Sequence, residues 1–362
     1  MHGIHASLVT PFTPPGGVDA KSLHRLAVHC LENGVDGLVA LGTTGEAALL
    51  SPAEQRTVLE VCRAACDEHG APLIVGAGTM GTADSIREAR ERAAFADALL
   101  VVVPYYLRPS DEAVVDHFAA VGAAVDVKLV PYNIPYRTGR HLSADTLLAI
   151  LALDCVTGMK HCAGGIDADT LTMLASNHGK QVLGGDDAYL YPMLRLGAAG
   201  GVTASACLAP SAYATMLDAT RHGAAADALA LHNTLLPMVD ALFGEPAPAV
   251  LKACLAGLGV IDDPAVRAPL RAPRPESVAA AMAAFAALER LSRRRERRRG
   301  RRAGGRPGRA PAPPRRARTT GTTPRTPTAA GTRRAPGRRG RTPRTPWSFG
   351  AGRRRSRPPA SR

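Results

Sequence analysis

The strongest constraint on the fold is an alternation of short apolar segments with longer segments that carry a helical pattern. This alternation is typical of β/α units rather than of a β-sandwich or a helical bundle. Several of the apolar segments have no polar side, as parallel strands buried on both faces require. Eight such strands predict an α/β protein with a closed (β/α)8 TIM barrel. The predicted strands are Ile4 to Val9, Gly37 to Leu41, Leu73 to Ala77, Ala98 to Val103, Val127 to Tyr132, Val156 to Lys160, Gln181 to Leu183 and Gly201 to Ala204.

Helix start signals lie between these segments. Ser51-Pro52-Ala53-Glu54 combines an N-cap serine, a first-turn proline and a glutamate at the third helical position. After the eighth strand the chain carries only Ala- and Leu-rich helical patterns, near 211–221, 225–243, 247–258 and 276–292. We therefore expect a barrel domain over residues 1–224 and a helical domain over residues 225–292.

The composition changes abruptly after residue 292. Residues 293–362 contain 25 of the 45 basic residues and one of the 31 acidic residues, so residues 1–292 carry a net charge of −10. A segment of Arg, Pro, Gly, Thr and Ala with few aliphatic side chains cannot form a core, and it predicts a disordered tail. The tail binds polyanions at most non-specifically, and a non-selected extension is the simpler interpretation.

Other features bear on location and cofactors. Seven scattered cysteines, an odd number, are typical of reduced and buried thiols, and no set of them has the spacing of a zinc site. We expect no metal and no cofactor. The chain opens without a basic and apolar leader, and no uncharged run reaches the ~18 residues of a membrane span. A cytoplasmic protein without membrane association is expected.

Two polar residues at the ends of neighbouring predicted strands suggest covalent chemistry. Lys160 ends the sixth strand and Tyr132 ends the fifth, so both should reach the open mouth of the barrel. Apolar surroundings disfavour an ammonium ion and leave some free amine to attack a ketone, while a phenol beside it can transfer protons. The alternative to a catalytic role for Lys160 is a lysine that only extends its ammonium group to water. The alternative for Tyr132 is a tyrosine that packs in the core or at the rim of the barrel.

Gly42-Thr43-Thr44-Gly45 follows the second predicted strand. Its glycines permit a backbone in which successive amides point at one anion, and the two hydroxyls add further donors. The segment therefore fits a small carboxylate, although the same composition also makes ordinary turns.

In their order and spacing, five segments together resemble the dihydrodipicolinate synthase and N-acetylneuraminate lyase family over about residues 3–292. The resemblance implies a homotetramer or homodimer, and a Schiff base between pyruvate and Lys160 with Tyr132 as proton shuttle. It further implies that Thr43 links Tyr132 to Tyr106 of a neighbouring subunit, and that Thr43 and Thr44 hold the pyruvate carboxylate. The matching segments are Gly42-Thr43-Thr44-Gly45-Glu46, Pro104-Tyr105-Tyr106, Tyr132-Asn133-Ile134-Pro135, Gly158-Met159-Lys160 and Gly185-Asp186-Asp187.

Arg137 distinguishes the branches of this family. Synthase members carry Arg-Thr-Gly here, matched by Arg137-Thr138-Gly139, and the arginine receives the carboxylate of an acidic aldehyde. Gly185 and Thr203 complete the expected substrate-binding set. Thr203 replaces the usual aliphatic residue on the eighth strand, and Tyr136 replaces a small residue before the arginine, so both are expected to reshape the acceptor pocket.

The leading hypothesis is an enzyme that condenses pyruvate with aspartate 4-semialdehyde to 4-hydroxy-tetrahydrodipicolinate, on the route to diaminopimelate and lysine. Its partners are then small molecules and further copies of the chain. One alternative is a related pyruvate-dependent class I aldolase or dehydratase acting on a 2-oxo sugar acid or another aldehyde adduct. An alternative of another class is a polyanion-binding protein that acts through the arginine-rich tail.

Overall fold

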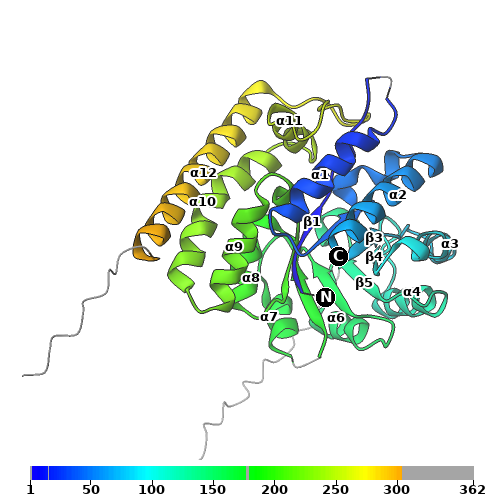
Figure 1. Cartoon of the computed structure of the whole chain (residues 1–362). Coiled ribbons are helices and arrows are strands. Elements are labelled where there is room, and N and C mark those ends of the chain that lie inside the picture. Colours follow the sequence, from blue (N-terminus) through cyan, green and yellow to red (C-terminus); the bar gives the residue numbers. More distant parts are fainter. Residues whose placement is uncertain (1, 15, 177–178, 304–362) are drawn as a thin grey trace, which may run out of the picture. The chain divides into compact units, whose positions relative to one another are not determined.

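The computed structural model describes residues 2–14, 16–176 and 179–303, with backbone only for residues 292–303. Eight parallel strands form a closed barrel in the order β1 to β8, and β1 pairs with β8 to complete it. The barrel predicted from the alternation is thus confirmed, and each strand overlaps its predicted range (Figure 1). The strands are β1 Gly3–Ser7, β2 Gly37–Ala40, β3 Leu73–Gly76, β4 Ala98–Val102, β5 Leu129–Asn133, β6 Gly158–His161, β7 Gln181–Gly184 and β8 Gly200–Thr203.

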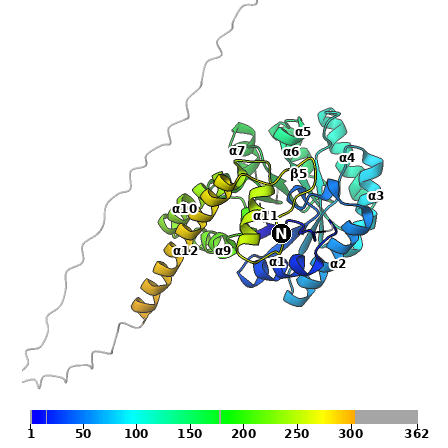
Figure 2. The same cartoon turned by 90° about the horizontal axis from the view of Figure 1, so that it is seen from above.

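Helices surround the barrel, as the view from above shows (Figure 2). The predicted capping box begins α2, where the Ser51 side chain accepts from the Glu54 amide and the Glu54 carboxylate accepts from the Ser51 amide. The helices are α1 Ala20–Glu32, α2 Pro52–His69, α3 Thr82–Arg92, α4 Asp111–Ala123, α5 Pro135–Thr138, α6 Ala144–Leu151, α7 Ala168–Ala175, α8 Leu190–Arg195, α9 Pro210–Arg221, α10 Ala225–Phe243, α11 Ala249–Gly257 and α12 Pro275–Ala303.

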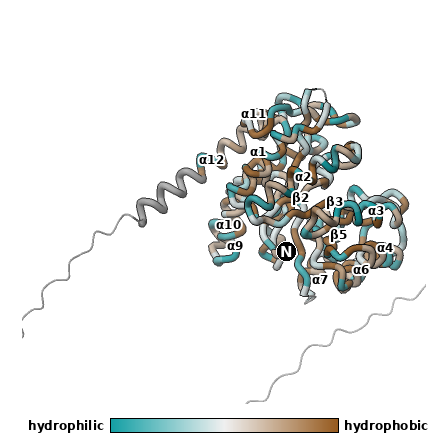
Figure 3. The backbone as a smooth tube through the Cα atoms, turned by 45° about the vertical axis from the view of Figure 1, so that its right-hand side comes forward, coloured by the Kyte–Doolittle hydropathy of each residue, from teal (hydrophilic) through white to brown (hydrophobic). Residues whose placement is uncertain are grey.

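Apolar side chains fill two regions. One cluster lies inside the barrel and includes Val39, Leu100, Val130, Leu183 and Val202. The larger cluster lies between the strands and the helices. Strands β2, β3 and β5 are accordingly hydrophobic in Figure 3, whereas α3 carries many hydrophilic residues. The strands are buried on both faces, which explains the continuous apolar sequences of β2 and β4.

The C-terminal helices belong to the same compact unit as the barrel. Helices α10 and α12 lie side by side (Figures 1 and 2). Helix α12 continues to Ala303, past the change in composition at residue 292, because arginine is a good helix former. The rest of the expected tail, residues 304–362, lies outside the described residues. No helix in the described part is both long and apolar enough to cross a membrane.

Candidate active site

Lys160 and Tyr132 lie side by side at the carboxyl end of the barrel. They are register partners on β6 and β5, and the Lys160 Nζ atom is 4.3 Å from the centre of the Tyr132 ring. Both side chains are buried and line one cavity, here called the lysine cavity. Its lining residues are Ser7, Thr43, Thr44, Tyr132, Ile134, Tyr136, Arg137, Lys160, Gly185, Asp187, Val202, Ala204, Phe243 and Ala247.

The Tyr132 side chain is buried, so its hydroxyl is poorly solvated. Its contact with the Cys162 thiol spans 4.0 Å between Sγ and Oη. Burial, followed by the neighbouring Cys162 and Tyr136, raises the pKa of Tyr132 well above its ordinary value. The phenol therefore keeps its proton at neutral pH and is available as a proton donor beside Lys160.

The threonine segment forms the short turn η1, Thr43–Gly45, directly after β2. The Thr44 hydroxyl accepts a hydrogen bond of 3.2 Å from the Ser7 hydroxyl on β1. Thr10 donates from its hydroxyl to the Gly45 carbonyl at 2.7 Å. We call residues 42–46 the cradle loop. Both threonines line the lysine cavity together with Lys160.

Arg137 and Tyr136 come from α5, the single turn that follows β5. Both line the lysine cavity, and the Arg137 guanidinium carbon is 5.9 Å from the centre of the Tyr136 ring. The Tyr136 hydroxyl donates to Asp186 at 3.1 Å, and the other Asp186 oxygen accepts from the Gly164 amide at 2.9 Å. Tyr136 is thus fixed at the rim of the cavity.

Gly185 follows β7 and packs directly against the nucleophile. A Cβ atom at this position would lie 2.8 Å from Lys160 Cε and 2.2 Å from Cys162 Sγ, so only glycine fits. Two residues on, the buried Asp187 carboxylate accepts from the Ser205 amide at 2.8 Å and also from the Ser205 hydroxyl. Burial raises the pKa of Asp187.

Thr203 and Tyr106 are not brought into this cavity. Val202 and Ala204 line it, and because side chains alternate along a strand, Thr203 between them faces the other way. The expected effect of Thr203 on the acceptor pocket therefore has no geometric support. Tyr106 is 81% exposed and does not line the lysine cavity.

His161, the residue after Lys160, points away from the cavity. Asn133 Nδ2 lies 3.3 Å from His161 Nδ1, and His161 Nε2 lies 2.9 Å from the Thr170 hydroxyl on α7. We assign the proton to Nε2, because Nδ1 then accepts from the Asn133 amide. Burial lowers the pKa of His161 to about 4, so the ring is neutral at pH 7.

Sequence reasoning missed several lining residues, including Ser7, Asp187 and Phe243. Ser7 stands 37 positions from Thr44, and only the pairing of β1 with β2 brings the two together. Phe243 is the last residue of α10 in the helical region, and no sequence motif connects it with the barrel strands. For Asp187 the matched Gly-Asp-Asp motif was an available signal.

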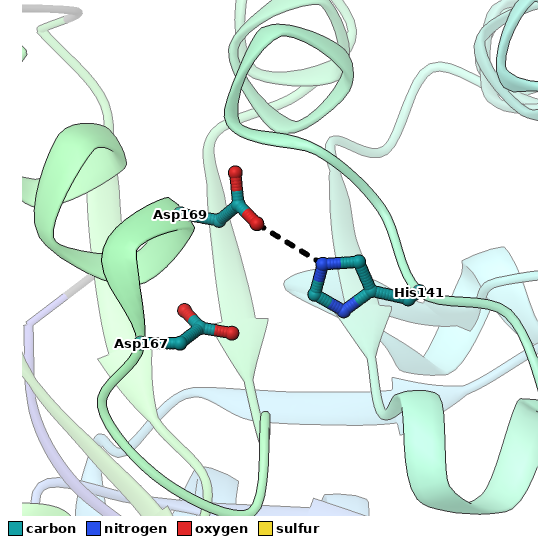
Figure 4. A group of neighbouring side chains, drawn as sticks. All are labelled: His141, Asp167 and Asp169. Carbon is teal, nitrogen blue, oxygen red and sulfur yellow. Dashed lines mark hydrogen bonds and ion pairs between the residues drawn. The ribbon is translucent and has the colours of Figure 1, made fainter. Parts of the chain in front are cut away.

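Among the described residues, one group of metal-ligand residue types lies outside the lysine cavity, and it consists of His141, Asp167 and Asp169 (Figure 4). Each carboxylate already has a structural partner. Asp167 caps α7 by accepting from the Thr170 amide at 2.8 Å, and Asp169 accepts from the Ala144 amide at 2.8 Å and pairs with His141. These hydrogen bonds explain the arrangement without a metal ion.

The geometry agrees with the comparisons to known proteins. The family model described as the dihydrodipicolinate synthetase family matches residues 1–287. The chain belongs to the dihydrodipicolinate synthetase family. A 4-hydroxy-tetrahydrodipicolinate synthase from Syntrophus aciditrophicus (strain SB) is 36% identical over 269 residues, which cover 74% of this chain and 91% of the relative.

Solved structures of this family have the same fold. The 4-hydroxy-tetrahydrodipicolinate synthase from Methylacidiphilum fumariolicum SolV superposes with a TM-score of 0.76 at 30% identity and covers 80% of this chain and 96% of its own. The chloride-inhibited dihydrodipicolinate synthase from Acinetobacter baumannii, complexed with pyruvate, gives a TM-score of 0.76 at 31% identity and covers 80% and 99%.

Proposed function

We propose that this protein condenses pyruvate with aspartate 4-semialdehyde to give 4-hydroxy-tetrahydrodipicolinate, the step that leads toward diaminopimelate and lysine. The observation that carries the proposal is the meeting of Lys160, Tyr132 and Arg137 in one cavity of a chain from this family. A nucleophilic amine, a proton donor and a carboxylate-binding cation are the three groups that this condensation requires.

The reaction begins with attack of the Lys160 amine on the keto carbon of pyruvate. Tyr132 gives a proton to the oxygen that leaves as water, and an imine forms. Thr43 and Thr44 hold the pyruvate carboxylate meanwhile. Loss of a methyl proton then gives an enamine, whose carbon attacks the aldehyde. The amine of the second substrate finally displaces the Lys160 amine as the ring closes, which regenerates the enzyme. The water lost when the imine formed is the only water released over the whole reaction.

Arg137 favours an aldehyde with a carboxylate group as the second substrate. Arg137 lines the cavity and is exposed to solvent, and its planar pair of donors suits the carboxylate of aspartate 4-semialdehyde. The Tyr136 hydroxyl bonded to Asp186 adds a polar rim that small residues would not provide. This rim favours a second candidate function, aldol cleavage or dehydration of a 2-oxo sugar acid on the same imine.

We further propose that the active unit is a homodimer or homotetramer in the cytoplasm. Tyr106 and Leu107 form an exposed apolar tip, 81% and 69% exposed, in a loop where Tyr106 has a φ of 66°. An apolar tip this exposed fits contact with a second copy of the chain. Tyr106 then reaches Thr43 of the neighbouring subunit.

One experiment tests the proposal. The full chain is reduced with borohydride in the presence of pyruvate, and mass spectrometry locates the adduct, expected on Lys160. A panel of aldehydes follows, with aspartate 4-semialdehyde expected to react fastest. If the adduct forms but aspartate 4-semialdehyde is not turned over, the result favours the second candidate function. If no adduct forms, the result contradicts both candidate functions. Removal of residues 293–362 should leave catalysis intact, and it tests the polyanion-binding alternative directly.

A further inference from the structure

A buried ion pair joins the helical region to the cradle loop. Lys252 on α11 and Glu46 at the end of the loop are 0% and 1% exposed, and their Nζ and Oε1 atoms are 2.9 Å apart. Glu46 lies 206 positions from Lys252, so the pair bridges the two ends of the fold. Lys252 does not line the lysine cavity, and neither does Glu46.

Both charges are held by further contacts. Lys252 Nζ also donates to the Thr10 carbonyl at 2.8 Å and lies 4.0 Å from the centre of the Phe12 ring. The second Glu46 oxygen accepts from the Arg267 amide at 2.8 Å. Burial lowers the pKa of Lys252, and Glu46 opposes that shift. The ammonium therefore connects a carbonyl of the segment after β1 with the carboxylate that ends the cradle loop.

Stability alone does not account for such a pair. Removing two charges from water costs several kcal/mol for each ion, and apolar replacements of buried pairs are often neutral or stabilising. The contacts instead specify one position of the loop. Thr10, whose carbonyl binds Lys252, also donates its hydroxyl to the Gly45 carbonyl at 2.7 Å. Lys252 thus acts on both residues that end the loop, directly on Glu46 and through Thr10 on Gly45.

The conformation of the loop explains why it needs this support. Glu46 has a φ of 54°, in the left-handed region that disfavours residues with a side chain. Left-handed backbone at a non-glycine residue persists only when its surroundings hold it there. The two threonines that line the lysine cavity immediately precede Gly45 and Glu46. A small rotation at Glu46 therefore moves the Thr43 and Thr44 hydroxyls relative to the nucleophile.

We propose that Lys252 is a positioning residue that, through Glu46, sets the loop whose threonines receive the carboxylate of the 2-oxo acid. The proposal deepens the proposed function and rests on it. The helical region is then part of the catalytic apparatus, because α11 supplies the cation that orders a binding loop of the barrel. Arg137 lies outside the loop, so the binding of the aldehyde is not affected.

The experiment compares three variants of the full chain: Lys252→Met, Glu46→Gln and the double variant E46Q/K252M. The first readout is the pyruvate concentration that gives half-maximal borohydride-trapped adduct, and the second is the midpoint of thermal unfolding. The Michaelis constant for the aldehyde is the third. Arg25→Gln is the matched control, because Arg25 on α1 also binds the helical side of the chain, at the Val260 carbonyl and Asp262, without touching the loop.

We expect Lys252→Met to raise the half-maximal pyruvate concentration about tenfold or more and to lower the unfolding midpoint, since Glu46 is left buried without its cation. In the double variant the midpoint should recover, because neither charge remains, while the pyruvate concentration stays raised. The aldehyde constant should change less than about twofold in all variants. Arg25→Gln should leave the pyruvate concentration unchanged.

A purely structural role predicts another pattern, in which pyruvate binding recovers together with the midpoint in the double variant. That result overturns the inference and leaves the proposed function intact. The double variant decides the matter even if Lys252→Met does not fold. A wild-type chain that forms no adduct with pyruvate overturns the proposed function, and the inference with it.

Discussion

Tyr132 and Lys160 face each other across adjacent strands, with the amine nitrogen 4.3 Å from the centre of the phenol ring. This relationship is rigid, since parallel register fixes the two Cα positions and burial restricts both side chains. An amine that attacks a ketone releases and recovers protons at the same place, and the neighbouring phenol lies within reach of them.

Replacement of Lys160 by alanine should abolish the covalent adduct and lower kcat by at least about a thousandfold, equivalent to ~4 kcal/mol of barrier. The amine is the only group in the proposed mechanism that bonds to substrate. Steady-state kinetics and mass spectrometry after borohydride reduction measure the two effects. Lys128→Ala is the control, because Lys128 precedes β5 and binds the Asp154 carbonyl at the opposite end of the barrel. Retained turnover in Lys160→Ala contradicts the mechanism.

Replacement of Tyr132 by phenylalanine should lower kcat by a factor of about 10² to 10⁴, the usual contribution of a positioned acid or base. Burial raises the pKa of Tyr132 well above its ordinary value. The wild-type rate should therefore show no loss from ionisation of this phenol as the pH rises to about 10. Tyr191→Phe, which removes a hydrogen bond to the Ala225 carbonyl, is the control and should affect stability only. An equal loss of rate in both variants would argue against a proton shuttle.

The sequence predicts this pair because both residues end continuous apolar strands, and a parallel barrel brings all strand ends to one mouth. The orientation of Thr203 was not predictable in the same way. Residues 200–203 are buried on both faces, so no alternation of polar and apolar residues indicates which side chains point inward. In the structure Val202 faces the cavity and Thr203 does not.

Interactions between residues far apart in the sequence were also not predictable. The Ser7 hydroxyl donates to the Thr44 hydroxyl 37 positions away, and no local pattern connects residues that far apart in the chain. The same is true of Lys252, which in the sequence is one lysine in an Ala- and Leu-rich helix. Its burial follows only from the packing of α11 against the loop after β1.

Arg137 is expected to govern the second substrate rather than pyruvate. Arg137→Ala should raise the Michaelis constant for aspartate 4-semialdehyde about 10- to 100-fold, because hydrogen bonds to a charged group contribute about 1.5–3 kcal/mol. The pyruvate concentration for half-maximal trapping should stay within about twofold. Arg137→Lys should also have a raised Michaelis constant for the aldehyde, because lysine lacks the planar pair of donors. The exposed Arg90 on α3 provides the control substitution to alanine.

Leu107 should support the proposed assembly. Leu107→Asp places a charge in the exposed apolar tip, so a dimer formed through this tip should dissociate at micromolar protein concentration. Analytical ultracentrifugation measures the change. Leu229→Asp on α10 is the control, because Leu229 is also exposed and apolar. If both variants sediment as the wild type does, the subunits meet elsewhere.

Acid should destabilise the fold through its buried histidines. Burial lowers the pKa of His5 and of His161 to about 4 in the folded chain, whereas an unfolded histidine titrates near 6.5. Between these values the unfolded state binds more protons, so the stability contributed by each neutral ring is complete above pH 6.5 and is lost as the pH falls toward 4.

The expected loss between pH 7 and pH 4.5 is about 2 kcal/mol for each ring, obtained from the free energy of unfolding in urea at both values. In His161→Gln, the free energy of unfolding should differ less between pH 7 and pH 4.5, by about that amount. It should do so while also lowering stability at pH 7, because Asn133 and Thr170 lose part of their hydrogen bonding. An unchanged pH dependence in this variant would mean that His161 does not titrate with folding.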